Sequence, residues 1–124
     1  MMIDTERIVS ALRAGLGPSV SVLVARSESP EACPRAVVLP PGRASAVEAG
    51  GEPLLTRIVQ PVRIATRSYG QADALACQAA DAMAGLGYRL AAWEPDPAPP
   101  RGVTLRFEAW EAPDGLIYPA EPAG

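Results

Sequence analysis

Three side chains capable of chemistry lie close together in one segment of the sequence. Asp73, Cys77 and Asp81 follow one another at intervals of four residues, so a helix places them on one face. Paired carboxylates can act as general acid and base, and an activated cysteine can act as a nucleophile. An acid/base pair also needs a cleft and a third group, and two neighbouring aspartates disfavour a thiolate. We therefore interpret this face as solvated and Cys77 as unreactive.

The residue types that usually carry catalysis and metal binding are scarce in this chain. It contains no histidine, which removes the most common general base and the most common metal ligand. Its two cysteines, Cys33 and Cys77, form no CxxC pair, so they cannot supply the four ligands of a structural zinc site. We therefore expect no enzymatic activity, no catalytic residue, no cofactor and no metal, and free thiols rather than a disulfide.

Arginines form a second candidate site, in a segment with strand-like alternation. Arg57, Arg63 and Arg67 occupy odd-numbered positions, so a strand directs them to one face. Such a stripe can grip a carboxylate or phosphate, face solvent, or form ion pairs with an adjacent subunit. The sequence favours the last two interpretations equally. Trp110 lies on the polar side of another predicted strand, which makes it the better interface candidate of the two tryptophans.

These residues must be positioned by a mixed set of helices and strands, in the order α-β-β-β-α-β-β. Apolar residues at helical spacing predict the helices, and alternation predicts the strands. The predicted elements are a helix over 5–14, strands over 20–25, 35–39 and 57–67, a helix over 72–86, and strands over 88–94 and 103–109. Beyond this order, residues 116–118 follow a turn signal and can fold back as a short last strand. This order predicts one α+β domain over 1–124, in which a mainly antiparallel sheet packs against two helices. Its ordered core covers about 5–111.

Four local signals add detail to this prediction. The glycine-rich segment over 40–53 has no apolar period and is predicted to be a long, mobile loop that a partner orders. Pro61 cannot donate a hydrogen bond to a neighbouring strand, so it indicates an edge position or a bulge. Ser68 and Gln71 have the spacing of a capping box at the start of the second helix. The end of the chain, over 119–124, is predicted to be frayed.

The composition is that of an ordinary globular chain of 124 residues, with 48% hydrophobic and 20% charged residues. No apolar run is long enough to cross a bilayer, and the first six residues lack the pattern of a signal peptide. We therefore expect a protein of the cytoplasm or of a particle assembled there. The 11 basic residues are scattered through a chain of net charge −3, so nucleic-acid binding is not expected to be the main function.

The ordered set of elements resembles the tail terminator, or tail completion, proteins of long-tailed bacteriophages such as lambda. The resemblance is carried by the N-terminal helix around residues 8–12, the proline-led strand over 34–39, the loose segment over 42–53, the strand over 57–67, the helix over 73–86 and the terminal strand over 103–108. It covers most of the chain from about Thr5 to Glu111. The proline-rich segment over 95–100 and the segment around Tyr118 have no counterpart in that pattern.

The resemblance implies a structural protein of the virion tail or neck, from a phage or a gene-transfer particle assembled in the bacterial cytoplasm. It implies a homo-oligomeric ring, commonly a hexamer, that sits on the last ring of the tail tube and stops tube growth. Its other partners would be the tail tube protein and a head–tail connector or neck protein, with no membrane and no sequence-specific nucleic acid.

Two alternatives stay open at this point. One is a neck or head-completion protein of the same kind of particle. The other is a small-ligand-binding or enzymatic α+β module, which would show convergent polar groups in a deep pocket. The absence of histidine and of any nucleophile–base pair disfavours the second alternative.

Overall fold

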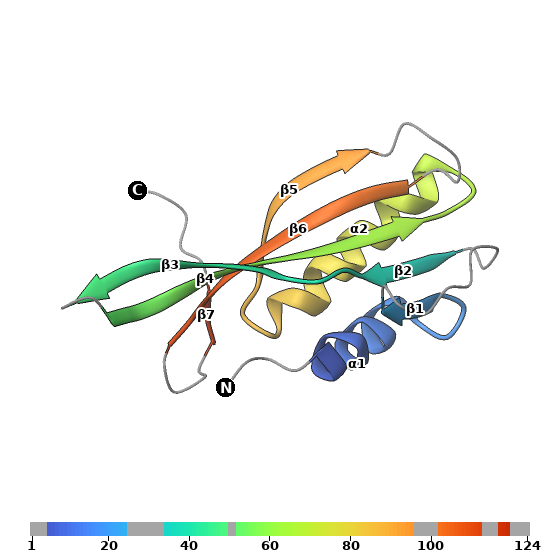
Figure 1. Ribbon diagram of the computed structural model, residues 1–124. Coiled ribbons are helices and arrows are strands. Elements are labelled where there is room, and N and C mark those ends of the chain that lie inside the picture. The colour runs from blue at the N-terminus through green and yellow to red at the C-terminus, as the bar shows by residue number, and fades with distance from the viewer. Residues whose placement is uncertain (1–4, 25–33, 50–51, 96–101, 113–116, 120–124) are drawn as a thin grey trace.

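The computed structural model describes residues 5–24, 34–49, 52–95, 102–112 and 117–119. Two helices and seven strands follow one another in the chain as α1 (Thr5–Leu16), β1 (Ser21–Val24), β2 (Arg35–Val38), β3 (Gly42–Ala49), β4 (Glu52–Ala65), α2 (Tyr69–Ala84), β5 (Arg89–Pro95), β6 (Gly102–Glu111) and β7 (Ile117–Pro119). The predicted α+β class, with a mainly antiparallel sheet against two helices, is confirmed (Figure 1).

The sheet is organised around two long antiparallel strands, β4 and β6, which pair from Thr56↔Glu111 to Ala65↔Gly102. At one end of this central pair, β2 flanks β4 and β5 flanks β6, and β1 continues the sheet parallel to β2. At the other end, β3 pairs with β4 and β7 pairs with β6. The sheet therefore has one half that carries the helices and a second half that extends beyond them (Figure 1).

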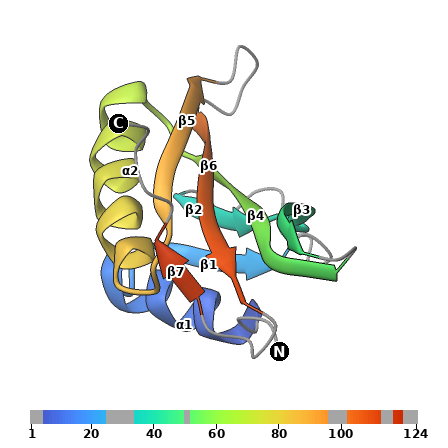
Figure 2. The same cartoon turned by 90° about the vertical axis from the view of Figure 1, so that its left-hand side faces the viewer.

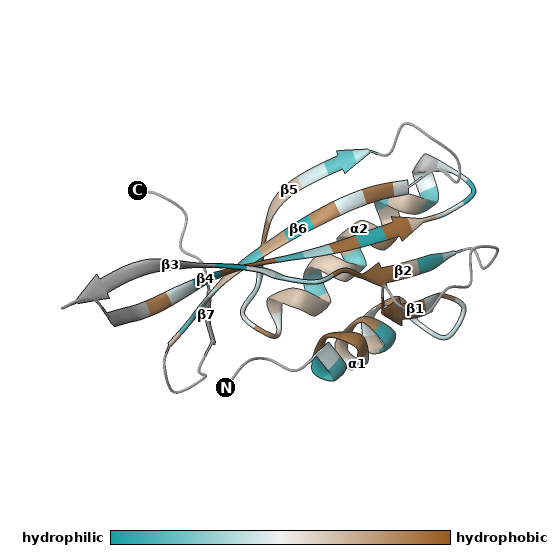
Figure 3. Cartoon of the chain, viewed as in Figure 1, coloured by the Kyte–Doolittle hydropathy of each residue, from teal (hydrophilic) through white to brown (hydrophobic). Residues whose placement is uncertain are grey.

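Both helices pack on the same face of the sheet and enclose the core (Figure 2). The predicted inward residues of β4, which are Ile58, Val62 and Ile64, are almost completely buried, and so is Phe107 of β6. Hydrophobic and hydrophilic residues alternate along these two strands (Figure 3). Full burial of one such side chain contributes about 1.5–3 kcal/mol, so this inward alternation is the main source of stability.

Small residues let the two helices lie close together. A Cβ atom added at Gly15 of α1 would lie 2.8 Å from the Cβ of Ala82 on α2, so the helices could not approach this closely with a larger residue. The capping prediction for α2 is confirmed in part, since the Ser68 hydroxyl accepts a hydrogen bond from the Gln71 backbone N–H at 3.2 Å. The helix ends near Gly87, whose φ of +93° suits glycine.

The predicted loop over 40–53 is wrong. Residues 42–49 form β3, which pairs with the start of β4 from Gly42↔Val59 to Ala49↔Glu52. Backbone hydrogen bonds hold this hairpin, so it needs no apolar period in its small side chains. Together with the end of β6 and β7, the hairpin forms a projecting arm that extends away from the helices (Figure 1).

Pro61 pairs with Arg106 of β6, so it does not lie in an edge strand. On its other side it lies between the end of the β2 pairing at Val62 and the start of the β3 pairing at Val59, where the register shifts by one residue, so the predicted irregularity is present there. The backbone N–H of Leu39 donates to the Pro61 carbonyl at 3.1 Å, on the side of the strand where proline lacks its own N–H. The side chain of Gln60 replaces that missing donor, with Nε2 donating to the Leu39 carbonyl at 2.6 Å. A buried glutamine therefore allows a proline to occupy a central strand.

Candidate interaction surface

One face of the sheet has neither of the two described helices against it. Figure 2 shows both helices on the opposite face, and Figure 1 looks onto the uncovered one. We call the uncovered surface of the helix-bearing half and its central strands the open face. Its side chains alternate along the strands with those of the core and are Leu23, Arg35, Val37, Arg57, Val59, Pro61, Arg63, Arg89, Ala92, Glu94, Thr104, Arg106, Glu108 and Trp110.

Ion pairs connect the central strands across the open face. Glu108 of β6 accepts a hydrogen bond from Arg57 of β4 at one carboxylate oxygen. Arg89 of β5 approaches the other oxygen to 3.4 Å. Beside this group, Arg106 Nη1 lies 2.8 Å from Glu94 Oε1. The three arginine side chains are 42–47% exposed, although the Nη1 atom of Arg106 is buried beside Glu94.

The described side chains of the open face carry an excess of positive charge. Five arginines and two glutamates give it a net charge of +3, in a chain whose total charge is −3. Half-buried Val37, Val59 and Pro61 lie among these charges. Arginine and tryptophan above a partly apolar surface are typical of protein–protein interfaces, where lysine and glutamate are depleted. The open face is therefore the candidate functional surface.

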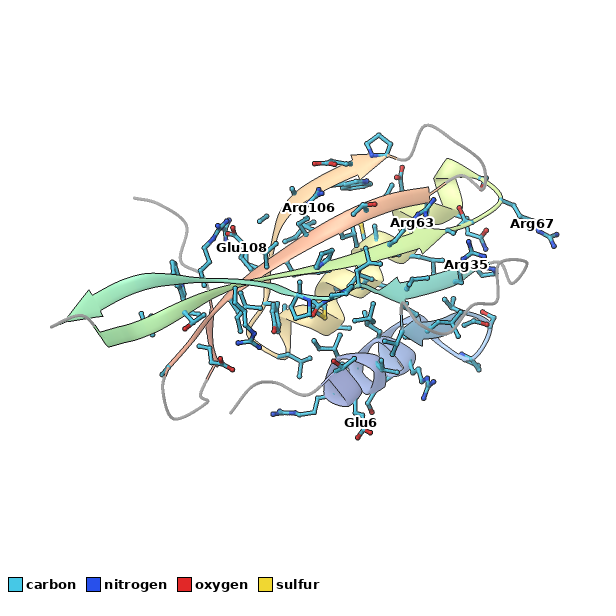
Figure 4. The ribbon with its side chains drawn as sticks, in the orientation of Figure 1. Glu6, Arg35, Arg63, Arg67, Arg106 and Glu108 are labelled. Atoms are coloured by element: carbon cyan, nitrogen blue, oxygen red, sulfur yellow. The ribbon has the colours of Figure 1, made fainter. Side chains whose placement is uncertain are left out.

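The structure brings together three of the four residues that the sequence predicts for an interface. Arg57 and Trp110 are directly opposed on β4 and β6, and Arg63 lies further along β4 on the same face. Arg67 does not belong to this surface, because β4 ends at Ala65 and the exposed Arg67 side chain points away from the sheet (Figure 4).

Sequence reasoning missed three arginines of the open face, which are Arg35, Arg89 and Arg106. They come from β2, β5 and β6, and β2 is far in the sequence from the consecutive strands β5 and β6. Only the strand order β1-β2-β4-β6-β5 places them around Arg63 and Glu108. The alternation of polar residues along β6 was a signal for Arg106, but nothing in the sequence indicates that β4 lies between β2 and β6.

A second polar group lies where the projecting arm meets the core. Arg43 of β3 donates from Nη1 to Glu111 Oε1 of β6 at 2.7 Å. The Glu111 side chain is largely buried, and its Oε2 has no hydrogen-bond partner among the described residues. Tyr88 is nearby and 4% exposed. Burial raises the pKa of the Tyr88 hydroxyl; Arg43 opposes that rise and Glu111 adds to it.

Tyr88 is expected to make folding sensitive to alkaline pH. The folded pKa of Tyr88 lies above the ordinary value of 10.0. The contribution of its protonated hydroxyl to the free energy of unfolding is therefore fully present below about pH 10, and it is lost as pH rises through the folded pKa. Urea unfolding of the wild type should show stability that falls above pH 10, and Tyr88→Phe should reduce that slope. Equal slopes for the two proteins above pH 10 would contradict the assignment.

The groups considered for covalent chemistry do not converge in the described structure. Asp73, Cys77 and Asp81 are exposed on α2, and Cys77 has no disulfide partner among the described residues. Cys33 and residues 120–124 lie outside the described residues. In the described ranges, no three His, Cys, Asp or Glu side chains lie close enough to hold a metal ion.

A hollow beside α1 and β1 likewise brings few polar groups together. Arg13 is its one ionisable lining residue, and Arg13 Nη2 is 3.4 Å from the Val22 carbonyl, to which it donates. This geometry lacks the convergent polar set that a ligand-binding module requires.

Among the helices of the described residues, none is long and apolar enough to span a membrane.

Comparisons with known proteins return no relative of this chain: no protein-family model, no curated protein and no solved structure matches it.

Proposed function

We propose that this chain is a non-enzymatic, structural subunit of a ring that caps the tail tube of a long-tailed phage or a related gene-transfer particle. In this role it stops tube growth and presents a surface to a neck or connector protein of the head. The proposal follows the resemblance of the element order to tail terminator proteins. The observation that supports it most is the open face of the sheet.

The open face suits a subunit that is covered by neighbours on assembly. A sheet with both helices on one side leaves half-buried apolar residues and arginines on the other side. A contact between two different surfaces of the same chain generates a ring when the rotation between subunits closes. On this proposal Arg57, Arg63 and Trp110 are interface residues, and Arg67 lies at the margin of the contact.

The projecting arm supports the same role. Its strands β3 and β7 are paired on one side only among the described strands, and the hairpin of β3 and β4 extends away from the helices (Figure 1). An unpaired strand edge is a natural site for contact with another chain. A subunit of a ring on a tube needs such an element to reach a neighbour or the last ring of tube protein.

The oligomeric mass of the purified chain tests the ring directly. We expect native mass spectrometry to show a closed species of about six times the 12.9 kDa mass of one chain, and electron microscopy to show annular particles. A chain that remains monomeric at its highest soluble concentration would contradict the proposal.

A further inference from the structure

We infer that the ring contact joins the open face of one copy to the exposed face of α2 on the next copy. The inference deepens the proposed function and rests on it, because it names the two surfaces that a ring of this chain would use. The evidence comes from charge, side-chain size and the positions of the two surfaces on opposite sides of the sheet.

The exposed face of α2 is acidic. Asp73 and Asp81 are its charged residues, since the helix from Tyr69 to Ala84 contains no lysine or arginine. The two aspartates are eight positions apart, so they lie on one face about 12 Å apart along the axis. Neither carboxylate forms an ion pair with a described residue.

Most exposed residues beside the two aspartates are small. They are Gly70, Ala74, Cys77 and Ala84, and the exposed Gln71 and Gln78 flank them. A surface of small residues lets a neighbouring sheet approach, so that its arginines reach the carboxylates and its half-buried apolar residues meet alanine side chains. The open face supplies those arginines, with Arg106 near the middle of β6 and its side chain 42% exposed.

The two surfaces cannot meet within one chain, because the sheet lies between them (Figure 2). Each copy therefore offers one positive and one negative surface on opposite sides, which is the arrangement of a head-to-tail contact. The open face also carries Glu94 and Glu108 among its arginines. Those carboxylates would repel a nucleic-acid backbone, so a second copy of the chain fits this face better than a nucleic acid does.

Charge reversal on each surface tests the inference. Arg106→Glu and Asp81→Arg are each expected to raise the concentration for half-assembly at least tenfold, because each places like charges across the contact. Asp81→Arg should leave the folded subunit intact or slightly more stable, since arginine suits the last turn of a helix. Arg7→Glu, an exposed reversal on α1, is the matched control and should assemble normally.

Mixing the two variants gives the sharper result. In a ring of alternating subunits, the altered open face of Arg106→Glu meets the altered helix of Asp81→Arg, and the remaining contact is the wild-type one. The equimolar mixture should therefore assemble within about threefold of the wild-type concentration, although each variant alone does not. Thermal unfolding of each variant confirms that the subunits are folded.

A cross-linking measurement identifies the contact independently. In a Cys33→Ser background, Cys77 reports on the α2 surface, and Arg106→Cys places a second thiol on the open face. Mild oxidation of the assembled protein should give a ladder of covalent dimers and larger species. The same experiment with Arg7→Cys should give no ladder.

Several outcomes overturn the inference, and they are distinguishable from failure of the ring. If the wild type forms rings but Asp81→Arg assembles normally, the α2 contact is wrong and the proposed function stands. Loss of DNA binding in Arg106→Glu, with unchanged assembly, would assign the open face to nucleic acid instead. A wild type that stays monomeric contradicts both proposals, whereas a dimer restored by mixing the variants supports this contact and contradicts the ring.

Discussion

Replacing Gly102 with alanine is expected to lower the free energy of unfolding by about 3 kcal/mol, enough to unfold a marginal domain. A Cβ atom at this position would lie 2.0 Å from the Ile64 carbonyl oxygen and 3.0 Å from the Ala65 Cα. Both atoms belong to the backbone of β4, so no side-chain rotation relieves the clash. Urea denaturation of the wild type and the variant measures the loss.

Gly42→Ala is the matched control for this prediction. Gly42 begins β3, is exposed, and has open space where its Cβ would lie. The substitution should change stability by less than about 0.5 kcal/mol. If Gly102→Ala proved as stable as Gly42→Ala, the close approach of β4 and β6 at this end of the sheet would be wrong.

Gln60→Glu is expected to destabilise the fold by about 3 kcal/mol or more at neutral pH. Gln60 is 2% exposed, and its Nε2 donates to the carbonyl oxygens of Leu39 and Pro61. A glutamate would place a carboxylate against those two acceptors in a buried position. Chemical denaturation compares the variant with the wild type and with Gln78→Glu, an exposed change on α2 that should cost less than about 0.5 kcal/mol.

The penalty of Gln60→Glu should also depend on pH. Burial raises the pKa of a carboxyl group, so the protonated side chain is favoured in the folded state. The loss in free energy of unfolding, relative to the wild type, should therefore shrink toward pH 4 and grow as pH rises through the folded pKa of the introduced carboxyl group. A deficit that is small at neutral pH and does not change with pH would show that Gln60 does not replace the missing donor of Pro61.

The elements that could be predicted from the sequence are those with a buried apolar face. Along β4, Ile58, Val62 and Ile64 alternate with polar residues, and burial of that face fixes both the strand and its orientation. The hairpin of the projecting arm lacked such a pattern because β3 combines small residues with charged ones and has no regular apolar alternation. Its signal was Gly50-Gly51, a dipeptide that favours a two-residue connection between strands and that lies between the paired residues Ala49 and Glu52.

The candidate surface was predictable only within single strands. Arg57 and Arg63 share a face because the side-chain period of a strand is two, which follows from the sequence alone. Their neighbours Arg89 and Arg106 depend on which strands pair, and that order is set by the packing of the whole sheet. The cluster of Arg43, Tyr88 and Glu111 was missed for the same reason, since it joins three strands or strand ends across the chain.

The length of tails made without this chain tests the central claim most directly. We propose that the protein stops tube growth, so deletion of its coding sequence from the phage or gene-transfer particle should give overlong tails of variable length that do not join heads. Supplying the wild-type chain from a plasmid should restore uniform tails, and supplying Arg7→Glu should do the same. Tails of normal, uniform length that join heads without the protein would contradict the account.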